Sequence, residues 1–387
     1  MNLRPILFIY IPLLLTSCTP TPDDANRGDS RSAPTSDQAA SDQAKQANQA
    51  KQAAAKQAKQ AAPTVPASPL PIDDRYPPAP ELQPAPDAIR IAVISDINSS
   101  YGTIGYSPTV RAAVDDIIRR QVHIVVSPGD LVAGQKPNLP YDAMWRTFHY
   151  QIGDVFFDNN IDFIMAPGNH DASAYPQHAI ERDAYARAFQ NRLPRATMLP
   201  GGAFPFYYAV TTRDILIIAL DITRPIRDDD PQLDWLQATL TQAKSARATL
   251  VLGHLPLSPI NFNQFFETAS SPRLRQLLQA APRTIYISGH HHIYYPGHIG
   301  ELRTISAPAL GSGPRSLFGA PPTNAYALIT IPPSAPPTVT ALVAPNFKRM
   351  IDHKSLPTRI LQTEREDIGI AEFIIESLDN SVTIPAI

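Results

Sequence analysis

Five short segments of the sequence place carboxylate, amide or imidazole side chains directly after an apolar run. Groups of these types bind metal ions and transfer protons, so they can do chemistry where they meet. The segments begin at Ser95, Pro128, Gly168, Gly253 and Gly289 and read SDIN, PGD, GNHD, GH and GHHH. One such segment alone is ordinary for a turn or a strand end. Five in succession predict a metal site assembled along one edge of a sheet.

The apolar runs before these segments are typical of buried strands. They are short, rich in β-branched residues and followed closely by Gly, Pro or Asp, and they cover residues 89–95, 122–126, 161–165, 248–252 and 284–287. Between the first two runs, one face of a predicted helix carries Val110, Ala113, Val114, Ile117 and Ile118. A strand, a helix and a strand form the unit of an α/β sheet, whose ligands bind beyond the carboxyl ends of the strands.

The order and spelling of the segments resemble the calcineurin-like metallophosphoesterase superfamily, whose pattern is D-x-H, G-D, G-N-H-D or E, a lone His and G-H-x-H. The corresponding residues here are Asp96-Ile97-Asn98, Gly129-Asp130, Gly168-Asn169-His170-Asp171, His254 and Gly289-His290-His291-His292. The resemblance covers roughly residues 88–344, and its GNHD and GHxH motifs in this order are highly specific. It implies an α/β fold, a four-layered α/β/β/α sandwich of two mixed sheets flanked by helices. It also implies two metal ions, which would be Mn, Fe or Zn.

The resemblance further implies a role for each site residue. Seven residues would bind metal: Asp96, Asn98, Asp130, Asn169, His254, His290 and His292. Asp130 would bridge both ions; Asp96, Asn98 and His292 would hold the first, and Asn169, His254 and His290 the second. His170 would act as an acid toward the leaving group or stabilise the transferring phosphoryl group, and Asp171 would orient His170 by a hydrogen bond. The implied reaction is attack of a metal-bridging hydroxide on a phosphate ester.

Asn98 departs from the pattern, which has histidine at this position. An amide oxygen binds a hard cation, but it binds Zn or Fe less strongly than imidazole does. The departure predicts a weaker first metal, a preference for Mn, or another ligand such as Tyr101. Purple acid phosphatases in the same superfamily also lack this histidine, so the change does not by itself imply inactivity.

Long connections follow the motifs and are expected to rim the pocket, because loops on a rigid scaffold usually carry recognition. They cover residues 133–141, 172–205, 255–271 and 307–323. Candidates for contact with phosphate or a base are Arg182, Arg192, Arg195, Phe262, Phe265 and Phe266, although surface charge and local packing are the favoured interpretation of each. His291 is expected to face away from the metals or toward substrate, and His123 to be structural.

The amino terminus has the pattern of an export signal. Arg4 precedes an apolar stretch at residues 6–15, which is shorter than a membrane span. Cys18 follows Leu-Thr-Ser in what resembles a bacterial lipoprotein cleavage box, and it is the only cysteine, so no disulfide framework is possible within the chain. The alternatives are an ordinary secretory signal or an anchor helix, and Pro5 and Pro12 argue against the helix. The pattern predicts an exported protein, lipid-anchored through Cys18 to a bacterial outer membrane or cell surface.

Residues 18–87 are rich in Ala, Gln, Lys and Pro and cannot bury enough apolar area to offset the entropy of ordering them. A spacer is the favoured interpretation, with a polymer- or wall-binding tether as the alternative. The predicted organisation is a signal peptide at 1–17, the spacer at 18–87, the catalytic domain at 88–345 and a C-terminal extension of unassigned role at 346–387. A formal net charge of −2 offers no electrostatic footprint for nucleic acid.

The sequence therefore predicts an exported enzyme that hydrolyses small phosphate esters, with monoesters slightly preferred to diesters. The alternative from another class is a surface lipoprotein that kept the fold, lost catalysis and now binds a ligand or a protein. The D-x-N spelling supports this alternative, and the complete GNHD and GHxH motifs oppose it.

Overall fold

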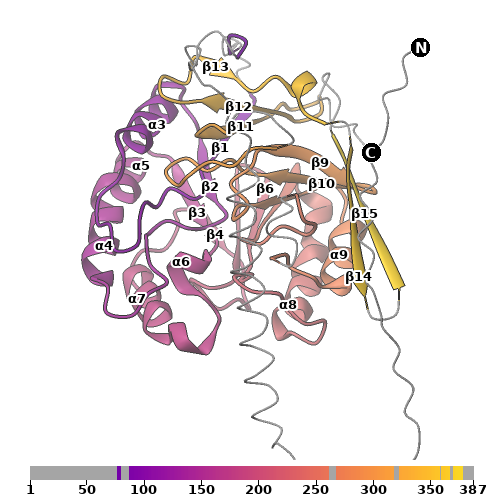
Figure 1. Cartoon of the computed structure of the whole chain (residues 1–387), viewed down its shortest axis with the longest axis horizontal. Coiled ribbons are helices and arrows are strands. Elements are labelled where there is room, and N and C mark those ends of the chain that lie inside the picture. The colour runs from indigo at the N-terminus through magenta and orange to yellow at the C-terminus, as the bar shows by residue number, and fades with distance from the viewer. Residues whose placement is uncertain are drawn as a thin grey trace, which may run out of the picture. The chain divides into compact units, whose positions relative to one another are not determined.

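The structure is a computed structural model that describes residues 76–79, 87–260, 267–317, 322–357, 359–366 and 369–377. The described strands form two sheets (Figure 1). The first sheet has the order β13-β12-β11-β1-β2-β3. Its strands are β1 (Ile89–Val93), β2 (Ile124–Ser127), β3 (Asp162–Met165), β11 (Ala325–Ile331), β12 (Thr338–Val343) and β13 (Arg349–Met350). β1, β2 and β3 run parallel, and β11, β12 and β13 pair antiparallel.

The second sheet has the order β14-β15-β9-β10-β8-β7-β6-β5-β4. Its strands are β4 (Thr197–Met198), β5 (Tyr208–Thr212), β6 (Ile215–Ala219), β7 (Ala248–Leu252), β8 (Thr284–Ser288), β9 (Tyr295–Ile299), β10 (Leu302–Ser306), β14 (Arg359–Glu366) and β15 (Gly369–Ser377). The four central strands β6, β7, β8 and β10 are parallel, and antiparallel strands extend the sheet on both sides.

Helices cover the outer faces of both sheets. On the first sheet lie α3 (Pro108–Arg119), α4 (Tyr141–Phe148), α5 (Asp154–Asp158) and α7 (Ala179–Phe189), and on the second lie α8 (Pro231–Leu240) and α9 (Pro272–Ala280) (Figure 1). The period-two alternation of β1 explains the layering. Ile91 and Val93 point into the core between the sheets, whereas Ala92 and Ile94 point into the core beneath the helices. The four-layered α/β/β/α sandwich is thereby confirmed.

The five strands and the one helix predicted from the sequence are confirmed, and each observed end lies within two residues of the predicted end. The predicted helix is α3, where the Ser107 side chain accepts a hydrogen bond from the amide of Val110 and Pro108 stands in the first turn. The five predicted strands are β1, β2, β3, β7 and β8. Among the described residues, no helix is both long and apolar enough to cross a membrane.

Residues on both sides of the predicted catalytic domain also join the sheets. Within the predicted spacer, Pro78 forms a bridge with Arg349 of β13, and the amide of Ala79 donates to the carbonyl of Lys348 at 2.8 Å. Within the predicted C-terminal extension, β13 pairs with β12, and β15 pairs with β9. The boundaries of the catalytic domain at residues 88 and 345 stay predictions from the sequence. Residues 76–79 and strands β13 and β15, which lie outside these boundaries, pair with strands of the two sheets.

Candidate metal centre

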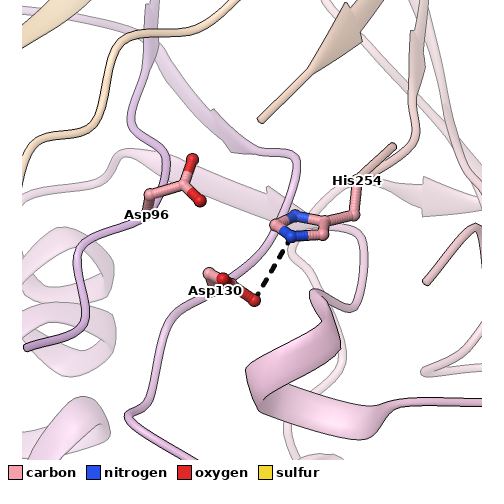
Figure 2. Close-up of side chains that lie close together, drawn as sticks. All are labelled: Asp96, Asp130 and His254. Atoms are coloured by element: carbon pink, nitrogen blue, oxygen red, sulfur yellow. Dashed lines mark ion pairs between the residues drawn. The ribbon is translucent and has the colours of Figure 1, made fainter. Parts of the chain in front are cut away.

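The polar segments meet where the carboxyl ends of the parallel strands of both sheets come together. Asp96 and Asp130 follow β1 and β2, and His254 follows β7; Figure 2 shows these three side chains facing one another. α6 (Asn169–Ala172) begins after β3 and carries the GNHD motif, and His290 follows β8. Ligands in open α/β sheets bind at such strand ends, and the five segments lie together there.

The backbone at this edge is crowded and adopts unusual conformations. Asp96, Asp130, His290 and His292 have φ angles of 49°, 60°, 66° and 57°, in the left-handed region that side chains rarely adopt. Gly129 has φ 112°, and a Cβ atom there would lie 2.4 Å from the amide nitrogen of Gly168. The glycine of the GD motif is therefore required because the turns after β2 and β3 touch. Strain of this kind persists where the surrounding fold holds it, and it often marks a functional site.

Asp96, Asp130 and His254 form a buried cluster that suits a cation. One ligand atom from each lies within 4.8 Å of the others, and the three side chains are buried. His254 Nδ1 lies 3.0 Å from the carbonyl of Pro128, which can only accept, so Nδ1 carries the proton and Nε2 offers its lone pair to the cluster. Burial lowers the pKa of His254 and favours this neutral ring. Two buried carboxylates beside an imidazole lone pair form a donor set that a metal ion would stabilise.

Asn169, His254 and His290 gather on one side of Asp130. Asn169 Oδ1 lies 2.7 Å from His254 Nε2 and 2.9 Å from His290 Nδ1. His254 Nε2 also lies 3.4 Å from Asp130 Oδ1. The three residues that sequence analysis assigns to the second metal are therefore neighbours, with Asp130 beside them.

Asp96 and His292 form a pair apart from the group of Asn169, His254 and His290. His292 Nε2 lies 3.1 Å from Asp96 Oδ1, and His292 Nδ1 lies 2.8 Å from the carbonyl of Gly313. Burial alone would raise the pKa of Asp96, but the charge and hydrogen bond of His292 bring it well below its ordinary value. Burial alone would lower the pKa of His292, and Asp96 raises it above the ordinary value. The side chains predicted to share the first metal are thus held together as an ion pair.

Asn98 lies at the same edge but is already engaged. Its side chain is buried, and its amide oxygen accepts a hydrogen bond from Ser312 Oγ, which also lies 3.1 Å from the main-chain carbonyl of Asn98. Tyr101, the suggested replacement ligand, instead packs its ring against His170 with the centroids 5.2 Å apart. A metal at Asn98 would have to share the amide oxygen with the serine hydroxyl.

His170 stands at the mouth of the cluster rather than inside it. Its side chain is 20% exposed, its Nε2 lies 3.9 Å from Asp130 Oδ2, and its main-chain amide donates to Asp130 Oδ1 at 2.9 Å. His170 Nδ1 lies 3.2 Å from the carbonyl of Gly134, which fixes the proton on Nδ1 and turns Nε2 toward Asp130. This placement suits a side chain that meets a substrate bound at the cluster.

The predicted hydrogen bond from Asp171 to His170 is wrong. Asp171 is buried and accepts hydrogen bonds from the amides of Leu131, Val132 and Gly168 at 2.8, 2.9 and 2.9 Å. Burial, and then the charge of Asp130, raise the pKa of Asp171 well above its ordinary value. Three main-chain amides satisfy this carboxyl group locally, so it joins the turns after β2 and β3. The carbonyl of Gly134 orients His170 instead.

Sequence analysis missed Glu267 and Arg315. Glu267 Oε2 lies 2.8 Å from His290 Nε2, an arrangement in which a carboxylate orients a metal-binding imidazole. Arg315 donates to the carbonyl of His290 at 2.9 Å, and the charges of Asp96, Glu267 and Asp130 act on its pKa, although burial lowers that pKa overall. Neither residue belongs to a motif; only their position in the predicted rim loops could have suggested them.

The candidate arginines of the rim, which are among the described residues, do not line the cavity beside the cluster. Arg182 pairs with Asp221 at 2.6 Å, Arg192 pairs with Asp154, and Arg195 lies over the ring of Phe157. The favoured interpretation as surface charge and packing therefore fits all three arginines. Phe262, Phe265 and Phe266 lie outside the described residues.

The remaining predicted histidines are not part of the cluster. His291 is buried, with Nε2 3.2 Å from the carbonyl of Glu267 and Nδ1 3.4 Å from the amide of Ile260, so both ring nitrogens are engaged away from the cluster; burial lowers its pKa to about 3. His123 Nδ1 accepts a hydrogen bond from the amide of Arg90 at 3.0 Å, a contact that fits the structural role expected for it.

A cavity of about 380 Å³ opens beside the cluster on the His170 side. Its walls are made by Asn98, Ser99, Ser100, Tyr101, Asp130, His170, His292, Gly311, Ser312 and Gly313. Most of these side chains are small, so a substrate group the size of a phosphate ester can approach Asp130 and His170 together.

The α/β/β/α sandwich with a buried Asp/His cluster at its edge is the arrangement of the metallophosphoesterase fold. The chain belongs to the calcineurin-like phosphoesterase family, whose profile matches residues 89–294. This is a family of metal-dependent phosphoesterases, and the enzyme class predicted from the sequence is confirmed at that level. No curated protein sequence matches the chain.

The chain is similar to solved structures, the first of which shares its fold. A purple acid phosphatase, PPD1, from yellow lupin (Lupinus luteus) seeds is 15% identical with a TM-score of 0.54, over 68% of this chain and 52% of its own. The match thus spans about half of the lupin enzyme. A dimetal phosphatase from Danio rerio is 15% identical with a TM-score of 0.46, over 66% of this chain and 95% of its own.

Proposed function

We propose that the protein is an exported, membrane-tethered phosphoesterase that holds two metal ions and hydrolyses phosphate esters, monoesters in preference to diesters. The observation that carries this proposal is the placement of His170 Nε2 3.9 Å from Asp130 Oδ2, at the mouth of the cavity beside the buried cluster. A cation site alone needs no such histidine at its mouth. A hydrolytic site does, because the leaving group must receive a proton.

The residues present fit the metal ions. One ion would be held by Asp96, Asn98 and His292, and the other by Asn169, His254 and His290. Asp130 would contribute to both. The support is chemical: Pro128 and Gly313 accept the Nδ1 protons of His254 and His292, which leaves Nε2 of each ring to bind a metal. When bound, the ions would lower the pKa of a water molecule and neutralise the charge of the phosphoryl oxygens.

The chain's own residues supply the remaining steps. His170 donates its Nε2 proton to the leaving-group oxygen as the phosphorus–oxygen bond breaks, and the Gly134 carbonyl keeps the other ring nitrogen protonated throughout. The Asp171 side chain accepts hydrogen bonds from three main-chain amides, and these bonds hold the turns that carry Asp130 and His170 at a fixed separation. This separation matters because even a small misplacement of His170 relative to the reacting phosphate would lower the rate strongly.

The preference for monoesters rests on charge. A monoester carries about one negative charge more than a diester near neutral pH, and Arg315 is a cationic side chain that donates to the carbonyl of His290, a predicted metal ligand, at 2.9 Å. Removal of this guanidinium should therefore weaken monoester hydrolysis more than diester hydrolysis. Arg315→Met should raise KM for the monoester, and an equal effect on both substrates would remove this argument.

The test compares metal content with hydrolysis of one chromogenic monoester and one chromogenic diester by the full chain. Asp130→Asn should lose metal and both activities. The matched control is Asp142→Asn, because Asp142 pairs with Arg187 at 3.1 Å on the exposed surface. Wild-type protein that binds metal but hydrolyses neither substrate would favour the alternative, a lipoprotein that kept the fold and binds a ligand.

We also propose that lipidation of Cys18 tethers the protein to the bacterial outer membrane or cell surface. The support is the sequence alone: an apolar stretch at 6–15 followed by Leu-Thr-Ser-Cys. Cys18→Ser should release or misprocess the protein, and the measurements are membrane fractionation and the mass of the mature amino terminus. The neighbouring Ser17→Ala is the control and should leave both unchanged. An unaltered mass and fractionation in Cys18→Ser would refute the tether.

A further inference from the structure

A second cavity, of about 460 Å³, lies at the opposite ends of the strands from the metal cluster. Its lining includes Ala248 and Thr284, which begin β7 and β8, whereas His254 and His290 follow the other ends of these strands. Each strand has five residues, so roughly 17 Å of extended chain separates the two regions. The two cavities share no lining residue.

Three arginines line this second cavity because of the strand order. Arg247 and Arg283 immediately precede β7 and β8, and Arg303 is the second residue of β10. The order β10-β8-β7 makes these strands adjacent and parallel, with Arg303 opposite Ile285. Neighbouring strands lie about 4.8 Å apart, so three guanidinium groups start from one short edge.

Protein groups offset only part of this positive charge. Arg247 pairs with exposed Asp214 at 3.6 Å, and Arg283 donates to the carbonyl of Lys244 at 2.7 Å. The half-buried Arg303 makes no hydrogen bond or ion pair with any residue that the structure describes, and burial lowers its pKa, partly opposed by the charge of Glu301. Glu301 is the only acidic residue in the lining. A guanidinium has five donors, so Arg303 has donors to spare for an anion.

The rest of the lining is mostly apolar and stiff. Leu278 of α9, Leu302 of β10 and Ile331 of β11 contribute to it, and residues 332–337, Pro-Pro-Ser-Ala-Pro-Pro, supply a wall from the other sheet. Proline has no amide donor and a fixed φ, so this wall changes shape little and adds few hydrogen bonds. The volume falls in the range that holds one small organic molecule.

We propose that this cavity is a binding site for a small organic anion, a molecule that joins one phosphate or carboxylate group to a small apolar body. The anionic group meets Arg303, with Arg247 and Arg283 beside it, and the body lies against Leu278, Leu302 and the proline wall. The ligand is bound and not hydrolysed, because the cavity lining holds no histidine or aspartate.

The test is titration calorimetry of the full, metal-loaded chain with phenylphosphonate, which carries a phosphonate and a phenyl ring. Two binding events are expected in the wild type, one at each cavity. Arg303→Gln should weaken one event by roughly ten- to a hundredfold, the usual loss for a charge-assisted hydrogen bond, and leave the constant for inhibition of ester hydrolysis unchanged. Asp130→Asn should remove the other event, so this test separates the second site from the catalytic proposal.

Arg187→Gln is the matched control, because Arg187 pairs with Asp142 on the exposed surface and lines neither cavity. Arg303→Lys keeps the charge and should bind phenylphosphonate with intermediate strength. This variant can replace Arg303→Gln in the experiment if Arg303→Gln does not fold. A second titration with benzoate in place of phenylphosphonate shows whether the cavity binds a carboxylate or a phosphoryl group more tightly. An Arg303→Gln chain that retains both events, or inorganic phosphate that binds as tightly as phenylphosphonate, would overturn the proposal.

Discussion

Asp130 and His170 lie next to each other but have different surroundings. Asp130 is buried, accepts the amide of His170 at 2.9 Å and lies 3.4 Å from His254 Nε2. The His170 ring is partly exposed, and it contacts the Gly134 carbonyl and the Tyr101 ring. Removal of the imidazole therefore leaves the donor atoms of the cluster in place, whereas removal of the Asp130 carboxylate does not.

We expect His170→Ala to retain both metals and to lose rate by roughly two to four powers of ten, the usual contribution of a general acid. The measurements are metal content per chain and kcat for a chromogenic phosphomonoester. Asp130→Asn, which should lose metal and rate together, provides the comparison. If His170→Ala also lost metal, His170 would belong to the metal-binding set.

We expect Asn98 to make the first metal the looser of the two. Its amide oxygen, already bonded to Ser312 Oγ, is a weaker ligand than the imidazole of the commoner D-x-H spelling. Activity should fall on dilution into metal-free buffer and return with added Mn²⁺. Asn98→His should reduce this dependence and Asn98→Ala should increase it, as measured by chelator competition. Equal retention of both ions in all three chains would contradict the assignment of Asn98.

Metal binding should weaken as the pH falls, and His292 sets the direction. Asp96 raises the pKa of His292, so in the metal-free protein a proton occupies Nε2 below that raised pKa. A metal must displace this proton, and its affinity should therefore drop about tenfold per pH unit below the pKa of His292. Mn²⁺ titrations between pH 5 and 8, a window around the ordinary pKa of about 6.5, would measure the slope. His292→Ala should bind more weakly and lose this part of the slope.

Residue types and order were enough to predict which side chains meet, because each follows a strand of recognisable pattern. Hydrogen-bond partners were not predictable in the same way. Asp171 bonds to three amides rather than to His170, since the turns that supply these amides approach it only in the folded chain. Glu267 and Arg315 contact His290 from loops whose sequences carry no spacing signal.

At the scale of elements, the turns after β1, β2 and β3 position the site by direct backbone contact. The amides of Asp96 and Ile97 donate to the carbonyls of Gly129 and Asp130 at 3.1 and 3.0 Å. The strands before these turns were predictable from their apolar, β-branched runs. The pairing of β15 with β9 was not, because it joins segments far apart in the chain and depends on which sheet edge is open.

Gly129→Ala should disrupt these contacts. The new methyl group would lie 2.4 Å from Gly168 N, and the residue keeps φ 112°, so the variant should lose about 1–3 kcal/mol of unfolding free energy and bind metal more weakly. Gly105→Ala is the matched control, since a Cβ atom there meets nothing within 4 Å. Denaturant unfolding and metal titration of both variants provide the comparison. An unchanged Gly129→Ala would show that the turns after β2 and β3 can move apart freely.

At the scale of the whole molecule, residues 76–79 of the predicted spacer contact the sandwich. Tyr76 is buried, and its carbonyl accepts from the Arg349 side chain at 3.0 Å. The carbonyl of Pro77 accepts from the amide of Met350 at 3.0 Å. Residues 76–79 therefore act as a short edge segment beside β13, about ten residues before β1.

A chain that begins at residue 76 should consequently unfold like the full-length protein, whereas a chain that begins at residue 88 should not. Loss of the buried Tyr76 side chain should cost about 1.5–3 kcal/mol of unfolding free energy, the usual value for burying a large side chain. Denaturant unfolding of both shortened chains and of full-length Tyr76→Ala separates loss of the side chain from loss of its backbone bonds. All three should still hydrolyse the test ester, because residues 76–79 line neither cavity. Equal stability of the chain from residue 88 would show that the segment beside β13 contributes nothing to the fold, and would return the start of the stable unit to β1.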